Sequence, residues 1–268
     1  MPTLLQRDQH ISYYEESGSG IPLILICGIS ADLSVWKYLA AELSQQFRVV
    51  MLDNRGVGRS AVPDAPFTVA DMAEDVRALM DHLEIDSAYV LGWSMGGIIA
   101  QTLALNYPAR VQKLVLVGSF AEPDVMLREA IGTWVNLYQS NMPYEQIARH
   151  VAWLNYSPAL ANKPVYEKFI QSIIDNPYRQ SVIGFVRQAE SLVSFRASPE
   201  LARLSVPITV LVGRDDKLAP PYLSEHLAQT IPGATLQVLP GAHAGFIEYP
   251  KLYAQALLAA LSSVSPKG

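Results

Sequence analysis

The sequence contains a single cysteine, Cys27, among its 268 residues. One cysteine excludes an internal disulfide and a cysteine-based zinc cluster, and it is typical of a reducing compartment. The start of the chain has no basic region followed by an apolar run, so the pattern predicts no secretory signal and we expect a cytoplasmic protein. Cys27 itself is expected to be a small buried residue rather than a reactive thiol.

Charge and long apolar runs are also scarce. Charged residues make up 17% of the chain, and 20 basic and 25 acidic residues leave a formal net charge of -5 without strong clusters. This pattern predicts no nucleic-acid partner and no membrane partner. The apolar run at 21–29 is too short to cross a bilayer. Because half of the residues are apolar, we expect a globular protein with a large core, while its oligomeric state stays open.

Short apolar runs rich in β-branched residues alternate with segments of helical periodicity in the first 120 and the last 65 residues. The spacing predicts strands over 22–27, 47–53, 87–93, 113–119, 206–213 and 234–240, and helices over 34–46, 69–84, 95–111, 221–231 and 249–264. Thr68 is the expected N-cap of the second helix. Alternating strands and helices predict an α/β fold with a doubly wound, mostly parallel sheet.

The alternation stops between residues 121 and 199. This segment has helical patterning, aromatic residues and several prolines, but no convincing strand. We therefore predict a core formed by 1–120 and 200–268, with 121–199 inserted as a helical lid before the strand at 206–213.

The stretch Gly92-Trp93-Ser94-Met95-Gly96-Gly97 joins a predicted strand directly to a predicted helix. A serine with a glycine two residues away on each side, at a strand-to-helix turn, is typical of a nucleophile elbow. A serine hydroxyl is a poor nucleophile at neutral pH, and it needs a histidine to take its proton and an acid to orient that histidine. Ser94 is thus the candidate nucleophile.

In folds that carry a nucleophile elbow of this kind, the acid follows the serine and the histidine comes last, and the chain offers candidates in that order. Of the five histidines, only His226 and His243 follow the candidate acids. His226 falls within a predicted helix, whereas His243 follows the last predicted strand and is the better base. The acid is Asp215 or Asp216, which both follow the strand at 206–213. Taken alone, either acid would be interpreted as part of a solvated turn, but the position after a strand end, together with His243, favours a catalytic acid.

Four stretches together resemble motifs of the α/β-hydrolase fold superfamily. They are "GWSMGG" at 92–97, "DNRGVGRS" at 53–60, "GRDDKLAP" at 213–220 and "GAHAGFIEYP" at 241–250. The resemblance covers most of the chain outside the insertion. It implies that the catalytic acid precedes a proline by four positions, which selects Asp216, and that the backbone N–H groups of Ile29 and Met95 form the oxyanion hole. The chain departs from the family at Cys27, where a His-Gly pair is usual, which changes contacts in that loop without removing a backbone donor.

The resemblance implies a hydrolase that needs no cofactor or metal. A dinucleotide site is not expected, because the turn at 53–60 lacks a third glycine and does not open a helix. A serine nucleophile separates the chain from haloalkane dehalogenases and epoxide hydrolases of the superfamily, which use Asp. The glycine-rich oxyanion segments of proline iminopeptidases and of carbon-carbon bond hydrolases are also missing.

The expected reaction is hydrolysis of a small carboxyl ester or lactone, since the chain looks most like β-ketoadipate enol-lactone hydrolases and small carboxylesterases. Three alternatives stay open: a C–N hydrolase of the kind found in pyrimidine breakdown, a perhydrolase with the same triad, and a ligand receptor without catalysis.

Aromatic side chains are expected to line the substrate pocket, and one arginine of the insertion could bind an anionic group of the substrate. The candidate aromatic residues are Trp93, Trp134, Tyr138, Trp153 and Tyr156, and the candidate arginines are Arg128, Arg149, Arg179, Arg187 and Arg196.

Overall fold

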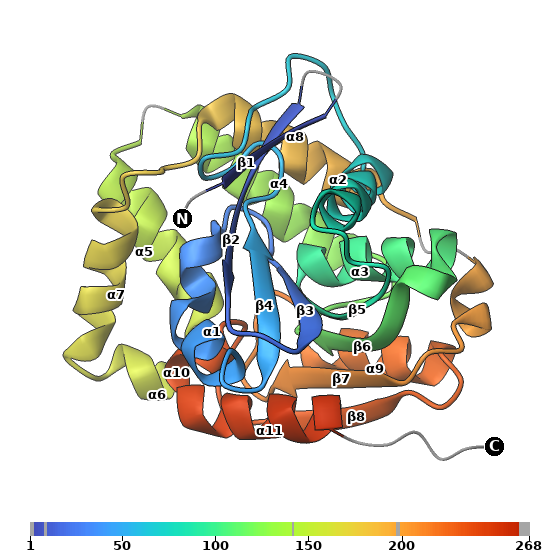
Figure 1. Ribbon diagram of the computed structural model, residues 1–268. Coiled ribbons are helices and arrows are strands. Elements are labelled where there is room, and N and C mark those ends of the chain that lie inside the picture. The colour runs from blue at the N-terminus through green and yellow to red at the C-terminus, as the bar shows by residue number, and fades with distance from the viewer. Residues whose placement is uncertain (1–2, 8–9, 141, 197–198, 263–268) are drawn as a thin grey trace.

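The computed structural model describes residues 3–7, 10–140, 142–196 and 199–262, which form an eight-stranded sheet flanked by helices (Figure 1). The strand order is β1-β2-β4-β3-β5-β6-β7-β8. The bounds are β1 Thr3–Arg7, β2 His10–Ser17, β3 Ile21–Ile26, β4 Phe47–Leu52, β5 Ala88–Trp93, β6 Val111–Val117, β7 Ile208–Gly213 and β8 Thr235–Leu239. All six predicted strands are present, and from β4 to β8 every neighbouring pair is parallel. The predicted α/β class and mostly parallel sheet are confirmed.

Strands β1 and β2 were not expected from the sequence. They pair antiparallel with each other at one edge of the sheet, and β2 joins the sheet by antiparallel pairing with β4, where Tyr14 lies opposite Leu52. The residues of β2 include several charged and hydroxyl side chains and no continuous apolar run. Because an antiparallel strand near an edge can leave part of its surface in water, its sequence lacks the signature of a buried parallel strand.

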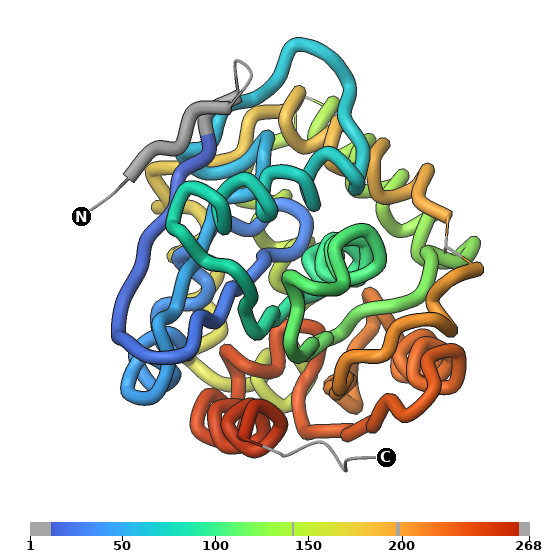
Figure 2. The backbone as a smooth tube through the Cα atoms, turned by 45° about the vertical axis from the view of Figure 1, so that its right-hand side comes forward, coloured from blue at the N-terminus to red at the C-terminus, as the bar shows by residue number. Residues whose placement is uncertain are grey.

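Successive residues of the central strands face two separate cores. Ile24 and Ile26 of β3 pack on the side of α2 (Val69–His82), α3 (Met95–Asn106) and α9 (Pro221–Thr230). Leu23 and Leu25 pack on the side of α1 (Lys37–Leu43) and α11 (Pro250–Ser262). Side chains alternate across a strand, so a strand covered on both faces is apolar throughout. Figure 2 looks along α3, which lies in the middle of the molecule with α2 beside it.

Helix α2 begins as predicted. The Thr68 hydroxyl accepts a hydrogen bond from the backbone N–H of Asp71, and the Asp71 carboxylate accepts one from the Thr68 backbone, which is a capping box. Its buried residues include Val69, Met72, Val76, Leu79 and Met80, which recur at helical spacing. The local sequence therefore determines where this helix begins and which face it buries.

Between β6 and β7 the described residues form helices and no strand. These helices are α4 Val125–Gln139, α5 Tyr144–Asn155, α6 Pro158–Ala161, α7 Val165–Ile174 and α8 Val182–Ser194, followed by the short 3-10 helix η3 Pro199–Arg203. Helix α4 packs on α8, and α5 packs on α7 (Figure 1). We call residues 121–199 the insertion. In the part of the chain described, no helix is both long and apolar enough to span a membrane.

Candidate active site

Ser94 lies between the end of β5 and the first residue of α3, in a backbone conformation that side chains rarely adopt. Its φ is 54° and its ψ is -121°, and such strain is found mainly where a site requires it. Surrounding hydrogen bonds hold the turn: the Ser94 N–H donates to the carbonyl of Val117 at 2.9 Å, and the Ser94 carbonyl accepts from the Ser119 hydroxyl at 3.0 Å. The hydroxyl of Ser94 has no hydrogen-bond partner among the described residues, and Ser94 lines a cavity.

The turn at Ser94 is possible only because position 96 has no side chain. A Cβ atom at Gly96 would lie 2.2 Å from the carbonyl oxygen of Ile26 and 2.6 Å from that of Cys27. Since both are backbone atoms next to β3, neither can rotate away. The glycine on this side of Ser94 therefore lets the elbow approach the neighbouring strand.

We expect Gly96→Ala to destabilise the protein by about 1–3 kcal/mol or more, because a methyl group is forced against backbone. The free energy of unfolding, measured by urea denaturation, tests this. Gly132→Ala is the matched control: Gly132 lies within α4 and nothing is within 4 Å of the position of its Cβ. Alanine there is expected to stabilise the protein by about 0.5–1 kcal/mol through helix propensity. Equal stability of the two variants would contradict the steric argument.

His243 and Asp216 form a buried pair at the carboxyl edge of the sheet. His243 lies in the loop after β8 and Asp216 in the loop after β7. Nδ1 of His243 is 2.7 Å from Oδ2 of Asp216, and the two residues are only 3% and 4% exposed. The other carboxylate oxygen, Oδ1, accepts hydrogen bonds from the backbone N–H groups of Leu218 and Ala219, at 3.0 Å and 2.8 Å. The acid is thus held on both oxygens and orients the imidazole.

The neighbouring acid, Asp215, is placed differently. Its side chain is exposed, and its backbone N–H donates to the carbonyl of Gly241 at 2.9 Å. Of the two adjacent acids that the sequence offers, only Asp216 therefore reaches a histidine. His226 lies on α9 and is exposed.

The loop after β3 carries Ile29, one of the two predicted oxyanion donors. Among the described residues, the backbone N–H groups of Ile29 and Met95 have no hydrogen-bond acceptor. Ile29 lines the same cavity as Ser94 and His243. Met95 is the first residue of α3, where backbone N–H groups have no acceptor within the helix. Neither amide is thus committed to an acceptor in the described part of the chain.

Cys27, at the start of this loop, is fully buried and unpaired. Burial raises the pKa of its thiol well above the usual range, so the thiolate that reactive cysteines require is disfavoured. The expectation of a small buried residue at Cys27 is confirmed. Its carbonyl oxygen accepts a hydrogen bond from the side-chain amide of Asn54 at 2.9 Å.

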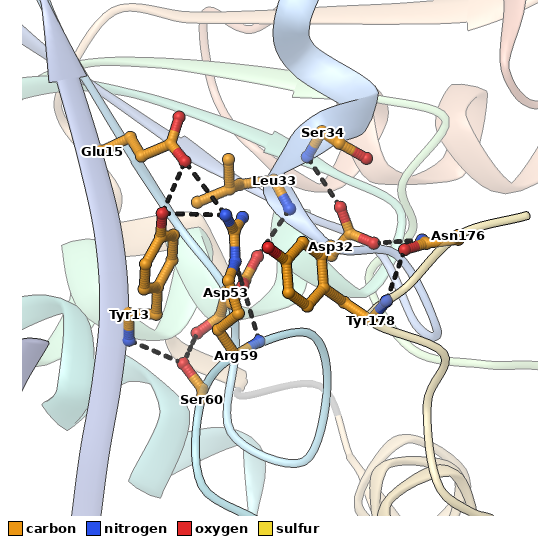
Figure 3. A network of polar contacts seen from close by, with 10 residues as sticks. All are labelled: Tyr13, Glu15, Asp32, Leu33, Ser34, Asp53, Arg59, Ser60, Asn176 and Tyr178. Carbon is orange, nitrogen blue, oxygen red and sulfur yellow. Dashed lines mark hydrogen bonds and ion pairs between the residues drawn. The ribbon is translucent and has the colours of Figure 1, made fainter. Parts of the chain in front are cut away.

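The turn at 53–60 holds the other end of the same loop (Figure 3). The Asp53 carboxylate, which is fully buried, accepts from the backbone N–H groups of Leu33 and Arg59, at 2.7 Å and 2.9 Å. The Arg59 guanidinium lies over the rings of Tyr13 and Tyr178, at 3.6 Å and 4.4 Å from their centroids. This turn therefore connects β2, the loop after β3 and the insertion.

The cavity that contains Ser94 and His243 has a volume of about 960 Å³. It is lined by the loop after β3, by the ends of the strands and by the insertion, and Trp93, Trp134, Tyr138 and Tyr156 are among its lining residues. Burial raises the pKa of Tyr138 to about 12, so its hydroxyl stays protonated and can donate a hydrogen bond. A volume near 1,000 Å³ is typical of pockets for small molecules.

Trp153 does not line the cavity, which corrects the expectation from the sequence. It is absent from the described lining of the cavity, and its side chain is 55% exposed. Its ring stacks on His150, and Nζ of Lys217 lies 5.2 Å from the ring centroid. Trp153 lies on α5, which turns Ala152 and Leu154 toward the protein core and Trp153 outward.

One of the five candidate arginines, Arg179, lines the cavity, and its guanidinium lies 4.4 Å from the centroid of the Tyr144 ring. The other four do not appear in the described lining. Arg149, for example, pairs with Glu145 and Glu167 on an exposed surface.

Two further residues near the candidate site, Ser30 and Gln188, were not expected from the sequence. The Gln188 side chain, on α8, accepts a hydrogen bond from the backbone N–H of Ser30 at 3.1 Å. These residues are 158 positions apart, and a glutamine within an amphipathic helix carries no local signal of such a contact. No group of three or more His, Cys, Asp or Glu placed to hold a metal ion occurs in the described ranges.

Comparison with known proteins agrees with this architecture. The alpha/beta hydrolase fold family matches residues 21–250. A protein of Azorhizobium caulinodans named carbamate hydrolase RutD is 30% identical over 250 residues, covering 92% of this chain and 93% of its own. The 3-oxoadipate enol-lactonase 2 of Acinetobacter baylyi is 26% identical over 260 residues, covering 97% of this chain and 96% of its own.

Among solved structures, the enol-lactonase of Burkholderia xenovorans LB400 has a TM-score of 0.88 and 25% identity, covering 97% of this chain and 100% of its own. The family match spans the elbow, the acid loop and the histidine loop. The chain therefore belongs to the α/β-hydrolase fold family and is a hydrolase.

Proposed function

We propose that the protein is a serine hydrolase that cleaves a small carboxyl ester or an (enol-)lactone through an acyl-enzyme on Ser94. One observation carries the proposal: the buried 2.7 Å pair of His243 and Asp216 opens on the same cavity as a serine held in a strained elbow. A buried acid that orients a histidine, next to a serine turn that lines the same cavity, is the arrangement that serine catalysis requires.

The proposed reaction starts with proton transfer from the Ser94 hydroxyl to Nε2 of His243. Asp216 accepts the Nδ1–H, so Nε2 is the unprotonated nitrogen, and the carboxylate stabilises the imidazolium that forms. Ser94 Oγ attacks the acyl carbon, and the Ile29 and Met95 N–H groups donate to the oxyanion. His243 then returns the proton to the leaving alkoxide, and water, activated by the same histidine, hydrolyses the acyl-enzyme.

The insertion forms the roof of the cavity in this proposal and acts as a lid. Trp134, Tyr138 and Tyr156, which it contributes to the lining, present mostly apolar surface to the acyl group. The substrate is thus a small molecule, and neither a nucleic acid nor a membrane is proposed as partner. A cytoplasmic location is also part of the proposal, because the one cysteine is buried and unpaired.

A second candidate function is hydrolysis of a carbamate or related C–N bond. It is favoured by the 30% identity to the relative named carbamate hydrolase RutD. The same nucleophile, base and oxyanion donors serve both reactions. The two reactions differ in the leaving group that His243 protonates, which is an oxygen in the ester or lactone and a nitrogen in the C–N compound.

A substrate panel tests both candidates. We expect p-nitrophenyl esters of short acyl chains, lactones or enol-lactones to be turned over. The p-nitrophenyl esters release their leaving group on acylation, and they should give a burst of up to one p-nitrophenol per chain when deacylation is the slower step. Matched carbamates and amides of the same acyl or amine groups are measured in parallel. A higher kcat/KM for the carbamates would favour the second candidate. Preference for peptides or long-chain lipids would contradict the small cavity, and tight binding without turnover would contradict catalysis.

A further inference from the structure

We infer that Gln188, on helix α8 of the insertion, is a positioning residue for the oxyanion donor Ile29. The inference rests on the proposed function, because it assigns Gln188 a role in stabilising the oxyanion. It is carried by the hydrogen bonds of the loop after β3, which hold the peptide units on both sides of the Ile29 amide.

Three consecutive peptide units of this loop have different partners. The unit between Cys27 and Gly28 is held through its carbonyl, which accepts from Asn54 Nδ2 at 2.9 Å. The unit between Ile29 and Ser30 is held through its N–H, which donates to Gln188 Oε1 at 3.1 Å. The unit between them has the Gly28 carbonyl, which accepts weakly from Ala31 N at 3.4 Å, and the N–H of Ile29.

The direction of the Ile29 N–H therefore depends on its neighbours. Because each peptide unit is planar, fixing the units on either side fixes both Cα atoms of the central unit. Only a rotation of the central unit about the line between those Cα atoms remains. The Ala31 contact, at 3.4 Å, opposes that rotation only weakly. The two side-chain amides, from Asn54 and Gln188, thus determine where the donor points.

Gln188 is suited to this role because every polar atom of its side chain is engaged and it is fully buried. Oε1 accepts from Ser30 N and from Gln180 Nε2, at 3.1 Å and 2.9 Å, and Nε2 donates to the carbonyl of Arg55 at 2.8 Å. A buried amide whose oxygen and nitrogen both have hydrogen-bond partners has one preferred orientation. Gln188 thereby ties the loop that carries Ile29 to the turn at 53–60.

Ser30 needs this support, because it is one of the few residues other than glycine with a positive φ, at 63°. Such a conformation persists only when the surroundings determine it. Two side chains of the insertion hold Ser30: Gln188 on α8 accepts from its backbone N–H, and the hydroxyl of Tyr138 on α4 lies 3.2 Å from the Ser30 hydroxyl. The insertion therefore does more than cover the cavity, since it also holds a part of the catalytic machinery in place.

Gln188→Met tests the inference, because methionine keeps the shape of the side chain and removes its hydrogen bonds. Burst kinetics with the best p-nitrophenyl ester of the panel give two separate quantities. The burst amplitude counts competent sites, and the acylation rate constant per site reports stabilisation of the transition state. We expect the rate constant and kcat to fall about 10- to 100-fold, approaching the loss of an oxyanion donor, with a KM within about twofold of wild type.

Two further variants make the result interpretable. Asn54→Leu releases the other peptide unit and is expected to lower the acylation rate per site in the same way, which covers the case in which Gln188→Met fails to fold. Gln101→Leu is the matched control: Gln101 is a buried amide on α3 that donates to the carbonyl of Phe120 at 3.1 Å and, among the described residues, has no hydrogen bond to the loop after β3. Its acylation rate per site is expected to stay within about twofold of wild type.

The inference is overturned if Gln188→Met acylates as fast per site as wild type, if the loss appears only in the burst amplitude, or if KM rises while kcat is unchanged. It is also overturned if Gln101→Leu loses as much rate per site. A wild-type protein that turns over no ester, lactone or enol-lactone of the panel would instead contradict the proposed function, and the inference with it.

Discussion

Ser94→Ala is expected to lower kcat by about a million-fold, the loss measured when a serine triad loses its nucleophile. The alanine methyl group fits the site, since Ser94 makes its hydrogen bonds through the backbone and its hydroxyl has no partner among the described residues. The variant should therefore fold normally and lack only the atom that becomes acylated. Initial rates on the best ester of the panel, together with thermal melting, provide the measurement.

Labelling identifies the reacting atom independently of rate. A fluorophosphonate should add once to the wild-type chain, at Ser94, as seen by intact mass and peptide mapping, and should not add to Ser94→Ala. Ser194→Ala is the control: its exposed hydroxyl donates to the carbonyl of Glu190 within α8, and both rate and labelling should be unchanged. An adduct on another residue, or activity retained in Ser94→Ala, would remove Ser94 from the mechanism.

Asp216→Asn is expected to lower kcat by about ten-thousand-fold without unfolding the protein. Asparagine keeps an oxygen for the N–H groups of Leu218 and Ala219, but its NH2 group then faces Nδ1 of His243. Because an NH2 group only donates, Nδ1 must become the acceptor and the proton moves to Nε2. A histidine in that tautomer cannot take the proton of Ser94.

Asp215→Asn is the matched control for this prediction, since it makes the same chemical change one residue away. Asp215 is exposed and does not reach a histidine, so we expect most of the activity to remain and stability to change by about 1 kcal/mol or less. Steady-state kinetics and thermal melting of both variants distinguish the two acids. Should Asp215→Asn lose activity and Asp216→Asn keep it, the orienting acid is Asp215 and the buried pair has a structural role.

Local sequence was sufficient for the parts of this protein that one continuous stretch specifies. Strands β3 to β7 are apolar runs because they are covered on both faces, and the start of α2 follows from Thr68 and Asp71, three residues apart. The candidate triad could be predicted for a related reason. Each of its loops directly follows a strand, and parallel strands bring their carboxyl ends to one edge of the sheet.

Packing between distant segments decided which other side chains reach the candidate site. Trp153 and Tyr156 looked alike in the sequence, but the rotation of α5 against the core turns Trp153 to solvent, while Tyr156 lines the cavity. Gln188 is an ordinary polar residue of an amphipathic helix until folding places it against Ser30, 158 positions away. The physical reason is the same in both cases. Periodicity and motifs report interactions along the chain, whereas the side chains that meet across a cavity are chosen by how whole helices pack, and that depends on every surface involved.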